Sequence, residues 1–569
     1  MSKKRGIQQE VGAMLRKVSV VTALILAIVM VVSTVCFAEA SPYAVSPVTK
    51  AAYDKLAADA SVKEALDFIK TDDANTLKEQ RTICEIPSPP FKEQVRAADY
   101  QKRLVAEGLK DVKKDLEGNV FGIIPGTGNG PKLLVTAHLD TVFPEGTDVT
   151  VKEKDDRLYA PGISDDTRAL AALLSVVRAI KDAGIQPVGD IIVGGNVGEE
   201  GLGDLRGVKA LFRDHPDIDG YISIEGGSRG RITYLATGSH RYEITYKGPG
   251  GHSFGAFGMP SAIHALGRAI AKIADFQVPT DPKTTFTVGT VSGGTSVNSI
   301  AAEAVMLVDM RSNDEQEVLN VEAKFLSEVK AAVVKENARW NSHAISVNIK
   351  LVGDRPAGSA PDNSAPVQAA YAAMQVIGGT PSLSGPSSTD INLPVFLGIP
   401  AIVLGGGGDS GNNHSPDEWY ANTDAYLGPQ DVLLTILGLT GVKGVTKPLL
   451  VKGAVRPILL ETNGKLQLSQ ADPQKAGSLV TVPLRAAVEG LGGQVTWDQA
   501  SKTAEAKLGG HSLKVNVGSA QVTLDGGAKT AAAAASLLNG KTMVSLDALT
   551  LLGIKGEYVD ATKLLKLTF

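Results

Sequence analysis

The strongest constraint on the fold is an alternation of short apolar runs with helical stretches that begins near Asn119. Glycine or proline bounds the runs, and helical apolar spacing separates them, as in Ala169 to Ala183. The runs are Val120 to Ile124, Lys132 to Ala137, Ile191 to Gly194, Tyr221 to Ile224 and Ala401 to Leu404. Strands that alternate with helices predict an α/β layer structure with a largely parallel sheet.

A chain of 569 residues is too long for a single hydrophobic core, so we expect several domains. Two further segments differ from the α/β part in their pattern of apolar and polar residues. Residues 239–352 combine alternating strands, such as Arg241 to Tyr246, with long helical stretches, so we expect a small α+β insert there. This insert divides the α/β part into 41–238 and 353–447. Short strands and Gly-rich turns then predict a separate module at 448–569.

The N-terminus has the order of a secretory signal. Five basic residues precede an apolar run from Val18 to Phe37, and Ala38-Glu39-Ala40 follows it. We expect a signal peptide at 1–40, although the run is long enough for an uncleaved membrane anchor to be the alternative. Either reading predicts an exported protein that is secreted or associated with the cell envelope.

Charge and cysteine content exclude two classes of protein. The whole chain has a net charge of −4, which becomes −7 without the five basic and two acidic residues of 1–40, so nucleic acid is not an expected partner. Because the chain has only two cysteines, any metal must be held by imidazole and carboxylate groups.

Acids and histidines recur where apolar runs end. In chain order these blocks are His138-Leu139-Asp140, Asp165-Asp166, Glu199-Glu200, Glu225 and His414. Ligands collect at the carboxyl ends of strands in such sheets. Taken singly, each block has an ordinary explanation: a structural histidine, a helix cap for one of the two aspartates, or solvated glutamates. Asp140 is expected to reach the imidazole of His138, since residues two apart on a strand point the same way.

Together, the order of these blocks resembles the zinc exopeptidase and deacylase family of peptidase T, glutamate carboxypeptidase, acetylornithine deacetylase and succinyl-diaminopimelate desuccinylase. The resemblance covers roughly residues 75–445 and rests on His138-Leu139-Asp140, Gly162 to Asp166, Gly198 to Gly201, Ile224-Glu225 and His414. It implies a catalytic α/β domain with an inserted lid and dimerisation domain.

The resemblance also implies a role for each block. Asp165 would bridge two zinc ions per subunit, with His138 and Glu225 on one ion and Glu200 and His414 on the other. Glu199 would be the general base, and Asp140 the residue that orients His138. Two such ions ~3.5–4 Å apart can share a carboxylate and polarise a carbonyl. The ligand types also admit Co²⁺ or Mn²⁺.

Further residues match positions outside the metal ligands. His252, in Gly250-Gly251-His252-Ser253, resembles the lid histidine that stabilises the oxyanion, in several relatives across a dimer interface. Asn298 and Arg311 resemble lid residues that hold the substrate carboxylate, and Ser388 lies in a segment that shapes the substrate pocket.

The C-terminal module resembles a second family. Val482 to Gly493, followed by Val495 to Asp498, resembles the repeat of the copper amine oxidase N-terminal-like domain, an accessory stalk, and Met543 to Leu549 looks like a degenerate second copy. His511 is the only histidine of the module, so a copper site is not expected. A spacer or envelope-binding role is the hypothesis for it.

These observations predict an exported dinuclear metallopeptidase that cleaves an amide bond of small peptides, as a tripeptidase-like exopeptidase. A carboxypeptidase or an N-acyl amino acid deacylase is the alternative. An inactive envelope-binding or scaffolding protein that has kept the fold is the second alternative, although no ligand or base position is missing.

Overall fold

The structure is a computed structural model that describes residues 43–453, 456–468 and 473–569. The chain forms one unit of residues 1–47 and another of residues 48–569. The expected signal peptide at 1–40 lies outside the described residues. Within the described ranges, no helix has the length and apolar character needed to cross a membrane.

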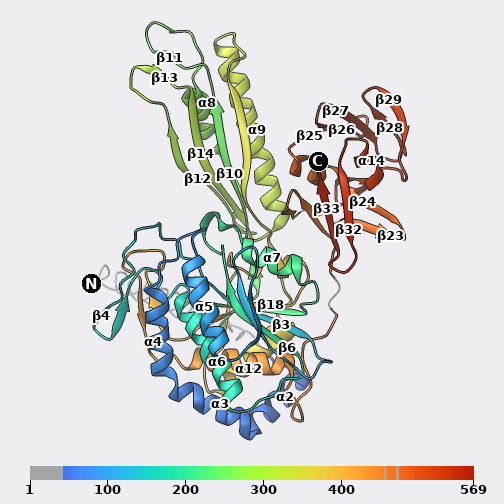
Figure 1. Cartoon of the computed structure of the whole chain (residues 1–569). Helices are drawn as coiled ribbons and strands as arrows, with labels where there is room; N and C mark the ends of the chain where they lie inside the picture. Colours follow the sequence, from blue (N-terminus) through green and yellow to red (C-terminus); the bar gives the residue numbers. More distant parts are fainter. Residues whose placement is uncertain (1–42, 454–455, 469–472) are drawn as a thin grey trace, which may run out of the picture. The chain divides into compact units, whose positions relative to one another are not determined.

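A mixed eight-stranded sheet forms the centre of the α/β part, in the order β1-β2-β6-β3-β7-β18-β8-β17 (Figure 1). The strands are β1 Lys110–Lys114, β2 Val120–Ile124, β3 Lys132–His138, β6 Asp190–Asn196, β7 Gly220–Glu225, β8 Arg231–Thr233, β17 Ser382–Ser384 and β18 Ala401–Gly405. The four central strands β6, β3, β7 and β18 run parallel, and antiparallel pairs join β1, β2 and β8 to them. The prediction of an α/β fold is confirmed, and the parallel character holds for the central strands.

Helices cover both faces of this sheet. One face is packed by α6 (Thr167–Asp182), α10 (Ala365–Val376) and α12 (Leu427–Thr440). The other is packed by α7 (Arg206–Asp214) and α11 (Asn392–Phe396), whose apolar side chains form one cluster with strand residues. Because both faces are buried, the central strands are continuous apolar runs.

Three N-terminal helices pack outside α6 and α12: α2 Pro47–Ala58, α3 Ala60–Thr71 and α4 Asp73–Cys84. The fourth, α5 Gln94–Ala106, packs against β1 and β2. The Asp59 carboxylate caps α3 by accepting from Ser61 and Val62 N–H. The hydroxyl of buried Tyr53 donates to the Leu434 carbonyl, which ties α2 to α12. This entry segment is therefore part of the catalytic fold.

Short strands flank the carboxyl edge of the central sheet. They are β4 Lys152–Lys154, β5 Arg157–Tyr159, β19 Asp409–Gly411 and β20 Trp419–Ala421, which form one sheet, and the pair β9 Leu235–Ala236 with β16 Gly358–Ser359. The loop between β19 and β20 carries His414. It is therefore anchored at both ends.

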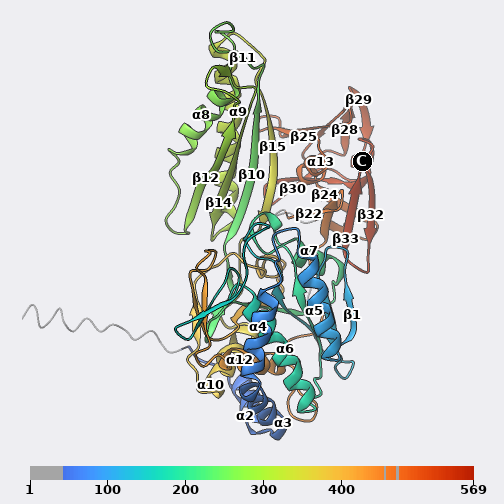
Figure 2. The same ribbon diagram turned by 60° about the vertical axis from the view of Figure 1, so that its left-hand side comes forward.

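The insert is a four-stranded antiparallel sheet with helices on one face, visible in Figure 2. Its elements are β10 Gly238–Lys247, β11 Gly251–His252, α8 Ala262–Ile273, β12 Thr284–Gly293, β13 Ser299–Ile300, β14 Glu303–Ser312, α9 Glu315–Arg339 and β15 Ser346–Arg355. Alternate residues of β10, such as Tyr242, Ile244 and Tyr246, pack against α8 and α9. We call this part the lid domain.

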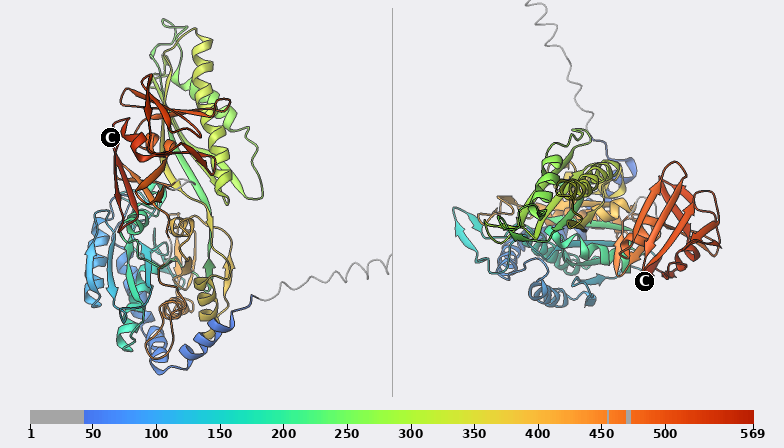
Figure 3. Two further views of the ribbon diagram at one scale, coloured as in Figure 1. Left: turned by 90° about the vertical axis from the view of Figure 1, so that its right-hand side faces the viewer. Right: turned by 90° about the horizontal axis from the view of Figure 1, so that it is seen from above.

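The described residues of the C-terminal module form three small sheets and two short helices (Figure 3). Its strands are β21 Leu459–Thr462, β22 Lys465–Gln467, β23 Gln474–Ala476, β24 Leu479–Pro483, β25 Gln494–Asp498, β26 Thr503–Leu508, β27 His511–Asn516, β28 Gln521–Leu524, β29 Gly527–Thr530, β30 Ser536–Leu538, β31 Lys541–Ser545, β32 Lys555–Val559 and β33 Leu564–Thr568, and its helices are α13 Leu484–Gly490 and α14 Leu546–Thr550. Both predicted copies of the repeat form strand, helix and strand, as β24-α13-β25 and β31-α14-β32.

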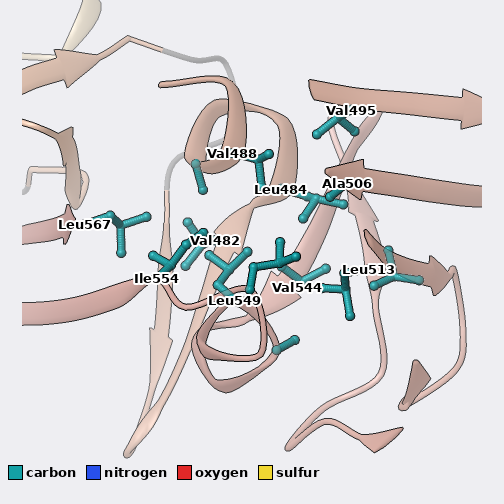
Figure 4. Packing of buried hydrophobic residues seen from close by; sticks show 14 of the residues in the cluster. Val482, Leu484, Val488, Val495, Ala506, Leu513, Val544, Leu549, Ile554 and Leu567 are labelled. Carbon is teal, nitrogen blue, oxygen red and sulfur yellow. The ribbon is translucent and has the colours of Figure 1, made fainter. Parts of the chain in front are cut away.

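The two copies share one core. Strands β24 and β31 pair antiparallel, with Val482 opposite Val544. Both residues are buried in one apolar cluster with Leu484, Val488 and Leu549 (Figure 4). A repeat whose copies pack on each other explains why the module has a core in spite of its few aromatic residues.

The module is also attached to the α/β part. Leu459 and Leu564 of β21 and β33 belong to the apolar cluster under α7 and α11. The Arg456 guanidinium donates to the backbone carbonyls of Phe212 and His215 at the end of α7. These contacts bury arginine where it satisfies the last carbonyls of the helix.

Candidate metal centre

Three parallel strands bring His138, the Glu199-Glu200 pair and Glu225 to one edge of the sheet. His138 ends β3 and lies opposite Asn196, the last residue of β6. The chain continues from β6 into the Glu199-Glu200 pair, and Glu225 ends the neighbouring β7. Since these strands are parallel, their carboxyl ends coincide, as expected for the ligand edge of such a sheet.

Asp165 lies between the two predicted metal histidines. Its Oδ1 is 3.0 Å from His138 Nε2, and its Oδ2 is 3.2 Å from His414 Nε2. His414 Nε2 is also 3.0 Å from Glu200 Oε1. One carboxylate with a different imidazole on each oxygen has the arrangement needed to bridge two cations.

Other donor atoms surround this carboxylate. Within the described residues, close groupings of potential ligands are His138 with Asp165 and Asp166, His138 with Glu199 and Glu200, and Asp165 with Glu200 and His414. Glu225 is outside these groupings, but its Oε1 is buried without a hydrogen-bond partner. A buried orphaned carboxylate oxygen beside histidine and aspartate is chemically suited to a cation.

The electrostatics of the site also favour added positive charge. Burial raises the pKa of Glu225 to about 7 and that of Asp390 to about 6. Hydrogen bonds to Asp165 and Glu200 raise the pKa of His414 to about 10. Acidic groups are therefore crowded in a buried place, where bound cations would balance them in place of protons. The residues present fit two metal ions.

Asp140 does not orient His138 in the expected way. His138 Nδ1 is 2.9 Å from the backbone oxygen of Asp140 and 3.8 Å from its carboxylate. The fully buried carboxylate instead accepts the backbone N–H groups of Gly198 at 2.8 Å, Glu199 at 3.2 Å and Glu200 at 2.8 Å. β3 ends at His138, so the strand alternation on which the prediction rests does not extend to Asp140.

Asp166 has a structural role different from helix capping. It precedes α6, but its side chain makes no capping bond. Its two oxygens accept the N–H groups of His138 and Gly226, each at 2.9 Å. The carboxylate thus joins the ends of β3 and β7 and holds both near Asp165.

Glu418 is a residue that the sequence reasoning missed. It is buried and accepts the N–H groups of Gly162 at 3.0 Å, Ser164 at 2.9 Å and Asp165 at 2.9 Å. It therefore fixes the loop that presents Asp165. The available signal was an acid four positions after His414, in a segment that reaches the same sheet edge.

Arg355 is the second missed residue. Its Nη1 is 3.1 Å from Glu199 Oε1, and Nη2 donates to the Glu199 carbonyl. Ser388 Oγ is 3.4 Å from the same guanidinium. Burial keeps the pKa of Glu199 well above its ordinary value, although the charge of Arg355 lowers it. The Arg-Pro pair at the end of the last lid strand was the signal in the sequence.

The predicted lid residues fall into two groups. Arg311 lies at the base of the lid domain, where it shares the Asp309 carboxylate with Arg241. Arg241 in turn donates to the Gly201 carbonyl next to Glu200. Arg311 is thus in a basic group beside the metal centre.

His252 and Asn298 lie together at the opposite end of β10. The Ser253 N–H donates to the Asn298 carbonyl, and both segments are exposed. Six strand residues at 3.2–3.4 Å each place the end of β10 about 20 Å from Arg241. The structure therefore does not bring His252 or Asn298 to the metal centre of its own chain.

Comparison with known proteins supports this fold. Aminopeptidase PepT from Bacillus cereus ATCC 10987 superposes with a TM-score of 0.51 at 22% identity, over 64% of this chain and 97% of that one. A Staphylococcus aureus tripeptidase gives 0.52 at 24% identity, with 64% and 97% covered, and human carnosine dipeptidase 1 gives 0.53 at 14%, with 67% and 98% covered.

Sequence comparisons agree with the structural ones. The uncharacterized protein YqjE of Bacillus subtilis is 26% identical over 354 residues, which are 60% of this chain and 89% of YqjE. Carboxypeptidase G2 of a Pseudomonas strain is 29% identical over 140 residues, 24% of this chain but only 33% of that enzyme.

Family patterns match two parts of the chain. Residues 134–437 match peptidase family M20/M25/M40, and residues 461–567 match the copper amine oxidase N-terminal domain. The first match includes every residue of the candidate metal centre. The chain therefore belongs to peptidase family M20/M25/M40, whose members are metal-dependent hydrolases of peptide bonds, and carries a copper amine oxidase N-terminal domain behind the peptidase part.

Proposed function

We propose that the protein is an exported dinuclear zinc exopeptidase that cleaves small peptides, with tripeptides as the preferred class. The observation that carries the proposal is the Asp165 carboxylate, which has His138 on one oxygen and His414 on the other. Imidazole and carboxylate ligands suit zinc, and Co²⁺ or Mn²⁺ would fit the same donors. In this proposal His138 and Glu225 hold one ion, and Glu200 and His414 hold the other.

Each of the other site residues has a separate role in the proposed reaction. The metal pair, when bound, supplies the positive charge that polarises the scissile carbonyl and acidifies the attacking water. Glu199 accepts the proton of that water and delivers it to the leaving amine. Arg355 orients the Glu199 carboxylate, and the charge of Arg355 favours the ionised form that a base requires. In this proposal Arg311, which lies at the base of the lid domain, binds a substrate carboxylate through its fork of donors.

A carboxypeptidase or N-acyl amino acid deacylase is the second candidate. Arg241 and Arg311 share the single Asp309 carboxylate, so positive charge exceeds negative charge there, and the charge of Arg355 also acts on Arg241. Such a basic group suits a substrate whose carboxylate lies close to the scissile bond. Carboxypeptidase G2 is one of the relatives that match the sequence.

We also propose a homodimer formed through the lid domain. His252 and Asn298 lie about 20 Å from the base of their own lid domain, so a second copy is needed to bring them to a metal centre. Exposed apolar side chains accompany them: Phe254 is 89% exposed, Phe257 81% and Val297 102%. Exposed apolar groups gathered in this way are typical of a protein interface.

Export and a cell-envelope contact through the C-terminal module complete the proposal. The basic and apolar N-terminal residues support export. The module adds no predicted catalytic or metal-binding residue to the peptidase part, which supports an accessory role.

Hydrolysis of a substrate panel tests the function. The panel contains tripeptides, dipeptides, and N-acetyl, N-succinyl and C-terminal glutamate substrates, each with and without a chelator. We expect turnover of tripeptides that the chelator abolishes and that Glu199→Gln removes. Glu336→Gln is the matched control, because Glu336 is also buried and paired with an arginine, Arg268, but lies in the lid domain away from the metal centre.

The possible results separate the candidates. Turnover confined to C-terminal glutamate or N-acyl substrates would replace the tripeptidase by the second candidate. Zinc binding without turnover of any panel member would favour the scaffolding alternative. Chelator-resistant turnover would contradict the metal mechanism itself.

A further inference from the structure

A buried ionic cluster lies at the base of the lid domain, apart from the proposed metal ligands. His240 of β10 has Nδ1 at 2.9 Å from Glu322 Oε1 of α9 and Nε2 at 3.4 Å from Asp354 Oδ1 of β15. The Tyr242 hydroxyl donates to the same Glu322 oxygen. The His240 side chain is only 6% exposed. An apolar side chain at position 240 would avoid the cost of desolvating an imidazole and two carboxylates, so stability alone does not explain this buried ionic cluster.

The cluster joins strands next to an irregularity. His240 pairs directly with Asp354 across β10 and β15, and the register shifts between Arg241 and Tyr242. A bulge there redirects the residues that follow it in β15, and bulges beside active sites commonly aim a side chain. The ion pair between His240 and Asp354 holds β15 just beyond the bulge.

The residue after Asp354 is the one that reaches the candidate base. Successive strand residues point to opposite faces, so Asp354 faces α9 while Arg355 faces Glu199. Arg355 Nη1 is 3.1 Å from Glu199 Oε1. Fixing Asp354 on one face therefore fixes the direction of Arg355 on the other.

Other parts of the chain hold the same strand from outside the lid domain. The Asp354 N–H donates to Asp204 at 2.7 Å, and Lys209 of α7 donates to the Asp354 carbonyl at 2.8 Å. The Leu468 N–H of the C-terminal module donates to the Asp354 carboxylate. Asp354 is thus the point where the lid domain, α7 and the module meet, and His240 is its charged partner on the lid side.

We propose that His240 is a positioning residue for the peptidase reaction, because its ion pairs with Glu322 and Asp354 set β15 so that Arg355 contacts Glu199. This inference rests on the proposed role of Glu199 as general base. His240 itself contacts neither the substrate nor the proposed ligands. Its effect on turnover passes through Arg355.

A double-mutant cycle in the full-length protein tests the proposal. His240→Gln keeps a polar side chain but removes the charge, and we expect kcat to fall roughly 10- to 100-fold with a much smaller change in KM, since a misplaced group close to the reacting atoms has effects of this size. In an Arg355→Lys background the same substitution should have little further effect on kcat, because the contact between Arg355 and Glu199, through which His240 acts, is already altered. The melting temperature should fall equally in both backgrounds.

A matched control and a second measurement separate positioning from stability. His215→Gln alters a partly buried histidine, which packs edge-on against Phe121 and is not part of the Asp354 cluster, so kcat should stay unchanged. Hydrogen exchange of the β15 amides 353–355 should speed up in His240→Gln and not in His215→Gln. This hydrogen-exchange measurement does not depend on turnover.

Two results would overturn the inference. The first is an equal fold loss of kcat for His240→Gln in the wild-type and Arg355→Lys backgrounds, and the second is unchanged exchange at 353–355. Neither result bears on the proposed function, which fails instead if Glu199→Gln keeps its activity.

Discussion

Replacing Asp140 by asparagine tests how the candidate base and ligand are held. One oxygen of the buried carboxylate accepts from Gly198 and Glu199, and the other accepts from Glu200 at 2.8 Å. Asparagine keeps one acceptor and turns an NH₂ group toward the third N–H. The loss of one hydrogen bond to a charged group costs about 1.5–3 kcal/mol, which corresponds to about 10- to 100-fold in affinity at 1.4 kcal/mol per tenfold.

The structure predicts which metal the change affects. Glu200 moves with its backbone, so the ion proposed for Glu200 and His414 should bind about 10- to 100-fold more weakly. The ring of His138 is held by a backbone oxygen, which the substitution keeps, so the other ion should bind as before. Calorimetric titration with zinc measures both steps, and His138→Asn and His414→Asn assign them.

One result would refute this reasoning. If Asp140→Asn weakened only the ion assigned to His138, the carboxylate would orient the imidazole, as expected from the sequence. Asp59→Asn is the control, because Asp59 also accepts two backbone N–H groups but caps α3, distant in the chain from the metal ligands. It should leave both binding steps unchanged.

Three further predictions concern stability and the loop of Asp165. Glu418→Gln should lower both kcat and the melting temperature, because an amide NH₂ replaces one carboxylate oxygen and at least one of three backbone N–H groups loses its acceptor; an unchanged kcat would contradict this. Burial raises the pKa of Asp431 above its ordinary value. Its ionisation therefore lowers the stability of the folded state as the pH rises from about 3.9, the pKa in the unfolded chain, to the raised pKa of the folded state. Thermal melts at pH 5 and pH 8 should differ less in Asp431→Asn than in the wild type, whereas the exposed control Asp54→Asn should keep the wild-type difference. For each of the two proposed ions, free zinc at 100 times the dissociation constant of that site should raise the free energy of unfolding by about 2.7 kcal/mol in denaturant melts. Glu200→Gln should reduce the gain from the ion that Glu200 is proposed to hold.

Much of the fold could be predicted because it depends on local pattern. The runs that became β2, β3, β6 and β7 carry their own periodicity and their own glycine boundaries. The strand edge that gathers His138 and Glu225 follows from parallel topology, so it was also predictable. The antiparallel pairing of β1, β2 and β8 was not, since local pattern carries no signal for the direction of a neighbouring strand.

The sequence named the candidate metal ligands and base, but not all of the residues and contacts that hold them. The resemblance to a peptidase family is confirmed by the family match, whereas the role of each residue stays a prediction. The separation of His252 and Asn298 from Arg311 depends on the length of β10, which a list of motif residues does not contain. Arg355 and Glu418 carry only weak signals in the sequence, the Arg-Pro pair and the acid four positions after His414, and their contacts establish their roles.

The sequence by itself determined which chemical groups are available: imidazole and carboxylate donors, a glutamate beside them, and arginines on an inserted domain. The tertiary structure decided which of these groups act together. Asp165 meets His414 across most of the catalytic part, and His240 meets Asp354 only after the lid strands have paired. The physical reason is that hydrogen bonds and ion pairs act over a few ångströms, while local pattern specifies elements and not the distances between them.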